Sequence, residues 1–522
     1  MHTLSKQIFS LLCMTVIMLS ACYDDKGNYT YHSLDNVVID TAGLGMQEAY
    51  VISRYDTLRL APNVYFNDNL VTNDNDYPLD YVWTIYTTVT SSGTDYTVDT
   101  LSHNRILEAP ITRTSGTYNI QLTITNRNNL TETYFSVPCN VEEAITAGWM
   151  AFYECADEPG TSDVGLIVNP LVKKNIIQNK EFWDLYKSSN GHHLDGTPVR
   201  ILHTVAQLSN DFVILTTNTN LVGVSYETFE QILSFEDFFY NAPTNRNISY
   251  YGSYGVTSGE VLINDNKVYT ATMSGVARNN FFGVPRSGEY GQLAGWLSDV
   301  KGQNYNCIVY DQTNQRFLVA PNSSIDFGSF AGQDMSACEF DVNNVGMELL
   351  MGDWGRNYYD VMLMGNGNQR CLAVANFRTS ALSSQNIGIG FYDVSDSPDI
   401  LQATTMAASY MGEYVLYGAG SKVYNLLYSS LQPASVLWEA PSPNEEVVCV
   451  RLQKFYFTTL FNMMLPNANT VLHIATWNES AHEGKIYQYR INSASGAILS
   501  EPMTYTVPGK VKDMGWKYAF EM

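Results

Sequence analysis

The chain has 522 residues, of which 45% are hydrophobic and 16% are charged, and it contains 36 tyrosines and 36 glycines. This length and apolar fraction are ample for a large core and favour two or more domains. A net charge of −23 without a basic stripe argues against a nucleic-acid partner and against adhesion of the protein body to anionic lipid.

Residues 1–22 are predicted to be a lipoprotein signal peptide. Lys6 provides a short positive region, and residues 8–19 form an apolar run that is too short for a membrane span, which takes about 20 residues. The run ends in Leu19-Ser20-Ala21-Cys22, which resembles the bacterial lipobox, with Cys22 as the acyl acceptor. The alternative is an ordinary secretory signal with an unrelated cysteine. Because stable anchoring takes more than one acyl chain, a lipoprotein's diacylglyceryl and N-acyl groups predict a firm anchor.

Residues 23–34 are predicted to be a polar, acidic tether. The segment Tyr23-Asp24-Asp25-Lys26-Gly27-Asn28 resembles the export signal of surface lipoproteins of Bacteroidota. It predicts an outer-membrane, lipid-anchored protein that is exposed at the cell surface. A plain solvated linker on a periplasm-facing anchor is the alternative.

Residues 35–143 are predicted to form a small immunoglobulin-like β-sandwich. Tyr81, Trp83 and Ile85 share one face of a predicted strand, and 116–124 alternates apolar with polar residues. Residues 126–129 form a turn, and 131–141 return as the last strand. Several short strands with a Trp on a middle strand are typical of this sandwich.

The sandwich resembles a PKD domain in its Tyr81-Val82-Trp83 strand and in the strand that opens with Gly116-Thr117-Tyr118. The acidic stretch 67–76 departs from that family. The start at Cys22, the Gly148-Trp149 junction and the segments 194–198 and 512–517 resemble PKD-like family lipoproteins of Bacteroidota. The resemblance implies a role beside a SusC/SusD-type nutrient-uptake complex, with a glycan or peptide ligand, and it implies no catalytic residues.

The acidic stretch also contains the one candidate cofactor site. Asn73-Asp74-Asn75-Asp76 is rich in oxygen ligands, but it lacks the glycine and the distal Glu of an EF-hand. Asp74 and Asp76 are therefore weak calcium candidates, and no other cofactor is predicted.

Residues 147–522 show repeated groups of three or four strands. The repeat of roughly 45 to 55 residues is the spacing of β-propeller blades and predicts about seven of them. Residues 510–520 are expected to pair with 149–154 and close the ring. A short helical turn is expected over 234–239, because Ser234 and Asp237 have capping-box spacing. Two β-sandwiches are the alternative architecture.

The cysteines that follow the leader are scattered and have no metal-ligand spacing. We expect buried, unpaired thiols, with a Cys139–Cys155 disulfide as the alternative. The six residues are Cys139, Cys155, Cys307, Cys338, Cys371 and Cys449.

The sequence contains no nucleophile elbow, phosphate-binding loop, HExxH motif or dinucleotide-binding glycine pattern. His192 and His193 lie in a predicted loop, where they could converge on a metal, although solvated histidines are the simpler interpretation. His203 and His473 fall in strand patterns and are expected in the core. Paired carboxylates could hydrolyse glycosides, and the candidates are Asp353, Asp360 and Glu289.

Aromatic residues in Gly- and Asn-rich segments are the most suggestive candidates for ligand binding, because flat rings pack against sugar faces. The residues are Tyr251, Tyr254, Phe282, Trp296, Trp354 and Tyr358. Packing between blades is the alternative. A binding and scaffolding protein predicts an aromatic-lined groove at one end of the propeller. A propeller-type glycan hydrolase or lyase predicts converging carboxylates or a histidine, and a purely structural protein predicts neither.

Overall fold

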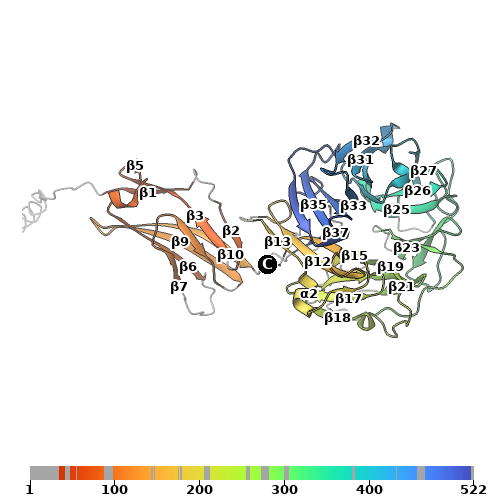
Figure 1. Cartoon of the computed structure of the whole chain (residues 1–522), viewed down its shortest axis with the longest axis horizontal. Helices are drawn as coiled ribbons and strands as arrows, with labels where there is room; N and C mark the ends of the chain where they lie inside the picture. The colour runs from red at the N-terminus through yellow and green to blue at the C-terminus, as the bar shows by residue number, and fades with distance from the viewer. Residues whose placement is uncertain are drawn as a thin grey trace, which may run out of the picture. The chain divides into compact units, whose positions relative to one another are not determined.

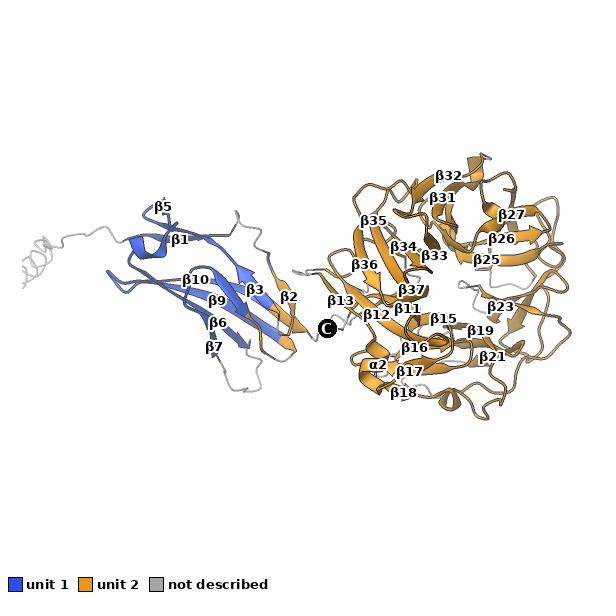
Figure 2. Ribbon diagram, viewed as in Figure 1, with its two compact units in different colours: residues 1–48, 57–109, 117–138 blue, residues 49–56, 110–116, 139–522 orange. Residues whose placement is uncertain are grey.

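The structure is a computed structural model, and it describes most of the chain after the predicted leader and tether. The described residues are 35–41, 47–54, 56–87, 98–113, 115–142, 145, 147–174, 176, 179–204, 212–253, 259–271, 281–298, 305–378, 383–430, 432–454 and 465–518. Cys22 lies outside them. None of the helices in these ranges is long and apolar enough to cross a membrane. Internal contacts divide the chain into two units, residues 1–48, 57–109 and 117–138, and residues 49–56, 110–116 and 139–522 (Figure 2).

The first unit contains most of a β-sandwich (Figure 1). A three-stranded sheet contains β1 (Val37–Asp40), β4 (Asn63–Phe66) and β5 (Asn69–Leu70), and a pair contains β3 (Thr57–Leu60) and β8 (Leu107–Pro110). The five-stranded sheet has the order β2 (Tyr50–Ser53), β10 (Glu132–Glu142), β9 (Gly116–Asn126), β6 (Leu79–Thr87) and β7 (Val98–Ser102). Strand β2, which runs parallel to β10, and the last residues of β10 are grouped with the second unit.

The period-two patterns of β6 and β9 place the core of the sandwich on one face of this sheet. Trp83 is fully buried and stands opposite Leu122 on the neighbouring antiparallel strand. Its indole Nε1 donates a hydrogen bond to the Arg105 carbonyl oxygen at 3.3 Å. The alternating residues predicted to face inward are buried, namely Tyr81, Trp83 and Ile85 on β6 and Tyr118, Ile120, Leu122 and Ile124 on β9.

Most of the second unit consists, in the described ranges, of seven antiparallel sheets. The first contains β13 (Lys180–Phe182), β12 (Thr161–Val168), β11 (Gly148–Cys155) and β37 (Gly509–Lys517), with β14 (Leu194–Asp195) beside β12. The second contains β15 (Pro198–Thr204), β16 (Phe212–Thr217), β17 (Leu221–Ser225) and β18 (Gln231–Leu233). The third contains β19 (Ile248–Ser253), β20 (Glu260–Asn264) and β21 (Lys267–Ala271), and the fourth β22 (Leu293–Leu297), β23 (Tyr305–Asp311) and β24 (Arg316–Pro321).

The last three sheets have four strands each. The fifth contains β25 (Glu348–Trp354), β26 (Asp360–Asn366), β27 (Gln369–Ala375) and β28 (Gly388–Asp393). The sixth contains β29 (Thr405–Ala408), β30 (Tyr414–Ala419), β31 (Lys422–Leu427) and β32 (Ser435–Glu439). The seventh contains β33 (Glu445–Leu452), β34 (Val471–Asn478), β35 (Glu483–Arg490) and β36 (Met503–Val507).

The sheets are the blades of a β-propeller. One strand of each blade contacts the corresponding strand of the next, in the order β37, β15, β19, β22, β25, β29, β33 and back to β37. Figure 1 shows the blades following one another around a centre. Middle strands such as β16 and β26 are buried on both faces, which explains their nearly continuous apolar sequences. The propeller prediction is therefore confirmed, and the architecture of two sandwiches is wrong for this region.

The two ends of the propeller sequence are joined within one blade. Strand β37 pairs antiparallel with β11, and Trp516 stands opposite Trp149. The predicted pairing of 510–520 with 149–154 is thus confirmed over the described residues.

Helices are short. In the described ranges they are α2 (Leu185–Asn190) and the 3₁₀ turns η1 (Asp74–Asp76), η2 (Phe235–Phe238), η3 (Arg356–Tyr358), η4 (Ile400–Gln402) and η5 (Tyr428–Ser430). The helical turn predicted over 234–239 is η2, and the Ser234 backbone N–H donates to the Asp237 carboxylate at 2.8 Å. The capping-box spacing therefore identified a real helix start.

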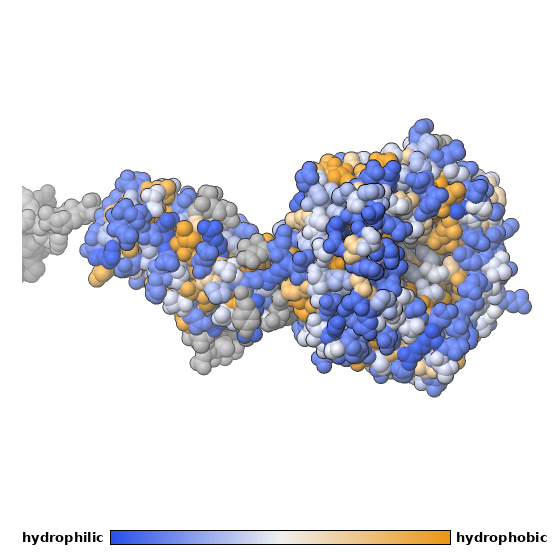
Figure 3. Space-filling model, in the orientation of Figure 1, coloured by the Kyte–Doolittle hydropathy of each residue, from blue (hydrophilic) through white to orange (hydrophobic). Residues whose placement is uncertain are grey.

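The cysteines after the leader are all buried and free. This confirms the expectation of unpaired thiols, and the alternative Cys139–Cys155 disulfide is wrong. The face of the second unit shown in Figure 3 is mainly hydrophilic, with hydrophobic residues in small separate groups.

Candidate functional site

Three aromatic rings meet where β25 and β29 end, one on the last residue of β25 and two on the segments that follow these strands. Trp354 and Tyr358 stack with their ring centroids 5.6 Å apart, and Tyr410 lies 4.8 Å from Tyr358 and 5.8 Å from Trp354. Trp354 is 7% exposed, whereas both tyrosines are half-buried. We call Trp354, Tyr358 and Tyr410 the aromatic cluster. Its buried indole supports two phenol rings that remain accessible to a ligand.

The backbone that presents Tyr358 is strained. Asn357 and Tyr358 have φ values of 60° and 59°, in the left-handed region, which a bulky residue rarely adopts. Hydrogen bonds from Gly355 N to the Tyr359 oxygen (2.7 Å) and from Tyr358 N to the Gly355 oxygen (3.1 Å) hold this turn. Strain of this kind concentrates at functional sites, which supports a binding role for this loop.

The loop that carries Tyr410 is a tight turn organised by Ser409. The Ser409 hydroxyl accepts hydrogen bonds from the backbone N–H groups of Met411 at 3.2 Å and Gly412 at 3.0 Å. A Cβ at Gly412 would lie 2.2 Å from the Ala494 oxygen, so only glycine fits there. Tyr410 is therefore held in a fixed turn.

Lys454, which follows β33, lies beneath the aromatic cluster and joins three blades. Its Nζ donates to Asp353 Oδ2 and to the Ala408 oxygen, each at 2.7 Å, and also to the Trp354 oxygen. The same ammonium stands 4.3 Å from the centre of the Trp354 ring, a cation–π contact. The Lys454 side chain is 7% exposed. This buried cation thus fixes the position of the supporting indole.

Charged groups lie beside the half-buried phenol rings. Arg378 places its guanidinium 4.8 Å from the centre of the Tyr358 ring, and Arg356 pairs with Glu413 at 3.0 Å. All three of these charged residues are exposed. Aromatic faces flanked by hydrogen-bonding groups suit a ligand with both apolar faces and hydroxyl or acidic groups.

The other predicted aromatic residues are placed elsewhere. Tyr251 and Phe282 are fully buried in the same core cluster, and Trp296 is 5% exposed in another. These three pack between strands, as the alternative interpretation predicted, and they present no open ring to a ligand. Tyr254 lies outside the described residues. Of the six predicted residues, the structure brings together Trp354 and Tyr358.

Sequence reasoning missed Tyr410, Lys454 and Arg378. Tyr410 has a detectable signal, because it follows the first strand of its blade, as the turn after Trp354 does in the preceding blade, and a glycine, Gly412, lies two residues after it. Lys454 reaches the cluster from another blade and Arg378 from the segment after β27 of the same blade, and their linear sequence context gives no indication of it.

Of the carboxylates considered for catalysis, Asp353 and Asp360 lie on the paired strands β25 and β26, and each is engaged with a different partner. Asp353 binds Lys454 and accepts the Ala408 backbone N–H at 2.8 Å. Asp360 is buried and accepts from the Ser298 hydroxyl at 2.6 Å, whereas Glu289 is exposed. These interactions are structural, and they do not give the pair of carboxylates that glycoside hydrolysis requires.

The weak calcium candidates lie in η1. Asp74 forms an ion pair with Arg105 at 2.7 Å, and Asp76 is exposed. Among the described residues, the groupings of three or more metal-binding side chains lie around His193 instead.

Three of the six histidines in the described ranges are buried. His473 forms hydrogen bonds with Gln453 at 3.0 Å and with Gln488 at 3.1 Å, as expected of a core residue. His203 is 4% exposed and accepts the Tyr518 backbone N–H at 3.2 Å. His193 is buried, so the simpler interpretation of solvated loop histidines is wrong for it.

Cys155 and His193 do not form a catalytic pair. Cys155 Sγ lies 3.3 Å from His193 Nδ1, but the same nitrogen bonds to Asp163 Oδ2 at 2.7 Å. Burial raises the pKa of the Cys155 thiol to about 12. A protonated thiol is a poor nucleophile, so this arrangement does not support acyl transfer.

The fold and the site together define a β-propeller protein with a β-sandwich and an aromatic cluster at the ends of adjacent inner strands. Within this class, residues 22–198 match the PKD-like family. This match confirms the resemblance predicted from the N-terminal segments.

The solved structures that match the chain are remote in sequence. A quinonprotein alcohol dehydrogenase-like protein from Bacteroides thetaiotaomicron matches with 13% identity over 92% of this chain and 98% of that chain, at a TM-score of 0.40. A putative 6-phosphogluconolactonase from Bacteroides uniformis matches with 8% identity over 84% and 99%, at a TM-score of 0.34. No curated protein sequence matches the chain.

Proposed function

We propose that the protein is an outer-membrane lipoprotein, anchored through Cys22 and exposed at the cell surface, that binds a glycan at the aromatic cluster beside a SusC/SusD-type uptake complex. The observation that supports this proposal is the aromatic cluster itself. Tyr358 and Tyr410 are held on fixed turns against a buried indole. Preorganised rings of this kind lose little conformational freedom when a sugar stacks on them.

Binding is tested on a soluble form, residues 23–522, with an array of neutral and acidic oligosaccharides. Tyr358→Ala and Tyr410→Ala should each weaken the best ligand roughly five- to tenfold, because each removes one stacking surface. The matched control is Tyr134→Ala, which removes a tyrosine that is 58% exposed on β10. A ligand that all three variants bind as the parent does, or an array without any hit, refutes glycan binding at this site.

The anchor is tested separately in cells. Labelled palmitate should enter the parent protein, and Cys22→Ala should abolish the label and release the protein from the membrane fraction. Equal membrane association of the two forms contradicts the lipoprotein assignment. Protease accessibility on intact cells then distinguishes a surface-facing from a periplasm-facing protein.

A hydrolase or lyase is the competing function. Incubation of the best array ligand with the protein should leave its chain length unchanged, because Asp353 is engaged with Lys454 and Asp360 with Ser298. Shortened or unsaturated products, measured by mass spectrometry, would establish catalysis in place of binding alone.

A further inference from the structure

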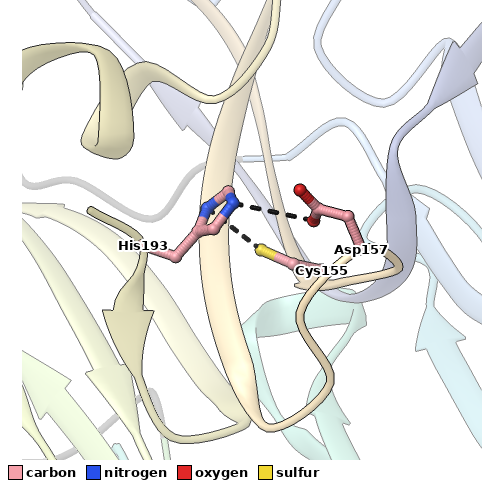
Figure 4. Close-up of side chains that lie close together, drawn as sticks. All are labelled: Cys155, Asp157 and His193. Carbon is pink, nitrogen blue, oxygen red and sulfur yellow. Dashed lines mark hydrogen bonds and ion pairs between the residues drawn. The ribbon is translucent and has the colours of Figure 1, made fainter. Parts of the chain in front are cut away.

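Thiol, imidazole and carboxylate side chains converge in the first blade, which contributes no residue to the aromatic cluster. Cys155 is the last residue of β11, Asp157 lies in the turn that follows, and His193 immediately precedes β14. Figure 4 shows the imidazole facing both other side chains. Cys155 Sγ lies 3.3 Å from Nδ1, and Asp157 Oδ1 lies 3.6 Å from Nε2. One ligand atom from each residue lies within 4.8 Å of the other two.

Asp163 fixes the orientation of the imidazole. Its side chain is fully buried and accepts backbone N–H groups from Val164 at 2.7 Å, Tyr186 at 2.9 Å and Lys187 at 3.0 Å. An acceptor held this way assigns the proton between it and His193 to Nδ1, so Nε2 keeps its lone pair. A carboxylate that holds one ring nitrogen while the other coordinates is the usual second shell of a metal-binding histidine.

A cation already occupies the open side of the imidazole. Lys187 Nζ lies 2.9 Å from His193 Nε2 and 3.6 Å from Asp157 Oδ2. The Lys187 side chain is 43% exposed and the Asp157 side chain 66% exposed, so the ammonium can leave toward solvent. His193, by contrast, is 1% exposed. The arrangement combines a fixed, buried donor with a replaceable cation and an approach from solvent.

We propose that Cys155 Sγ, His193 Nε2 and the Asp157 carboxylate bind a divalent transition-metal ion, for which Zn²⁺ is the best fit, with Lys187 displaced on binding. Sulfur, nitrogen and a single carboxylate suit Zn²⁺, whereas Ca²⁺ and Mg²⁺ take oxygen ligands. Three protein ligands leave the fourth tetrahedral position to water from the solvent-exposed side. The thiol proton is released to solvent when the Cys155–metal bond forms.

The test is a Co²⁺ titration of metal-free residues 23–522, followed by addition of Zn²⁺. One equivalent of Co²⁺ should give a thiolate-to-cobalt charge-transfer band and tetrahedral ligand-field bands, and Zn²⁺ should bleach both. Cys155→Ser should abolish the charge-transfer band, and His193→Gln and Asp157→Asn should weaken binding at least about tenfold. Cys449→Ser, which changes a buried free cysteine elsewhere, is the matched control and should leave the spectrum intact.

Lys187→Met tests directly whether the Lys187 ammonium is displaced by the metal. This test leaves all three proposed metal ligands in place, so it does not require a variant that lacks one of them to fold. Removal of the competing ammonium should tighten binding roughly two- to fivefold, the size of one partly exposed ion pair. The proposal is overturned by a parent protein without the charge-transfer band, by a band that Cys155→Ser retains, or by a Lys187→Met variant that binds no more tightly. Circular dichroism of each variant establishes that the comparison is between folded proteins.

Discussion

His473 illustrates how a polar side chain is accommodated in the propeller core. It is fully buried, bridges two glutamines, and stacks on Trp149 with ring centroids 4.0 Å apart. Because burial disfavours the charged imidazolium, the pKa of His473 falls to about 3. His203 behaves similarly, since burial and then the nearby Lys517 ammonium lower its pKa well below the ordinary value.

This burial makes the stability of the propeller dependent on pH. An unfolded histidine binds a proton below about pH 6.5, whereas folded His473 stays neutral until about pH 3. The unfolded state therefore binds more protons in that window, and stability falls as the pH decreases through it. Between pH 6.5 and 5, His473 should account for a loss of about 2 kcal/mol in the free energy of unfolding.

The measurement is denaturant unfolding at these two pH values. His473→Gln should remove this part of the pH dependence, whereas His103→Gln, at an exposed position, should keep it. A parent protein and a His473→Gln variant with equal pH dependence would contradict the argument.

The candidate site shows how far the role of a single residue can be predicted from the sequence. Tyr251 and Trp354 both stand beside glycine in aromatic-rich segments, yet Tyr251 lies within β19 and Trp354 at the end of β25. Only the second position opens onto a loop, the one that joins β25 to β26 within the blade. The sequence pattern located the strands but not which aromatic residue would leave the core, and the contacts of Lys454 with Asp353 and Ala408 depend on the packing of blades against one another.

At the scale of the element, the alternation of apolar and polar residues was sufficient to predict the strands of the sandwich. Continuous apolar runs were sufficient to predict the strands of the blades. The pattern of β9 predicted its buried face residue by residue, because a half-buried strand repeats every two residues. The short edge strand β13 escaped prediction, since its three residues, Lys180–Phe182, are only partly buried or exposed. Edge strands contribute little to the core, so their composition carries a weak signal.

The strand that closes the ring depends on a glycine. A Cβ at Gly509, the first residue of β37, would lie 2.1 Å from the Glu154 oxygen and 2.6 Å from the Tyr153 ring. Gly509→Ala must therefore move the backbone of β37 away from β11. We expect it to lower the free energy of unfolding by about 1–3 kcal/mol.

Gly332→Ala is the matched control for this closure. No atom lies within 4 Å of a Cβ placed at Gly332, so its effect should stay within about 0.5 kcal/mol. Thermal and denaturant unfolding of both variants provide the comparison. Equal stability of the Gly509→Ala and Gly332→Ala variants would show that β37 can move away from β11 without a cost in free energy.

At the scale of the whole molecule, stability comes from burial and not from covalent links. The propeller encloses its cysteines within blade cores: Cys449 packs beside Trp149 and Trp516, and Cys371 packs in the cluster that contains Trp296. Burial raises the pKa of the thiols of Cys139, Cys371 and Cys449. Buried, protonated thiols react slowly with oxidants and with other thiols.

We therefore expect residues 23–522 to keep six free thiols even after preparation in air. A thiol reagent should label few of them in the folded protein and all six, from Cys139 to Cys449, after denaturation. A reducing agent should leave the unfolding temperature unchanged, because no disulfide among these cysteines restricts the unfolded chain. Two thiols fewer in the denatured titration, together with a lower unfolding temperature in reductant, would reveal a disulfide and require Cys139 or Cys155 to leave its buried position.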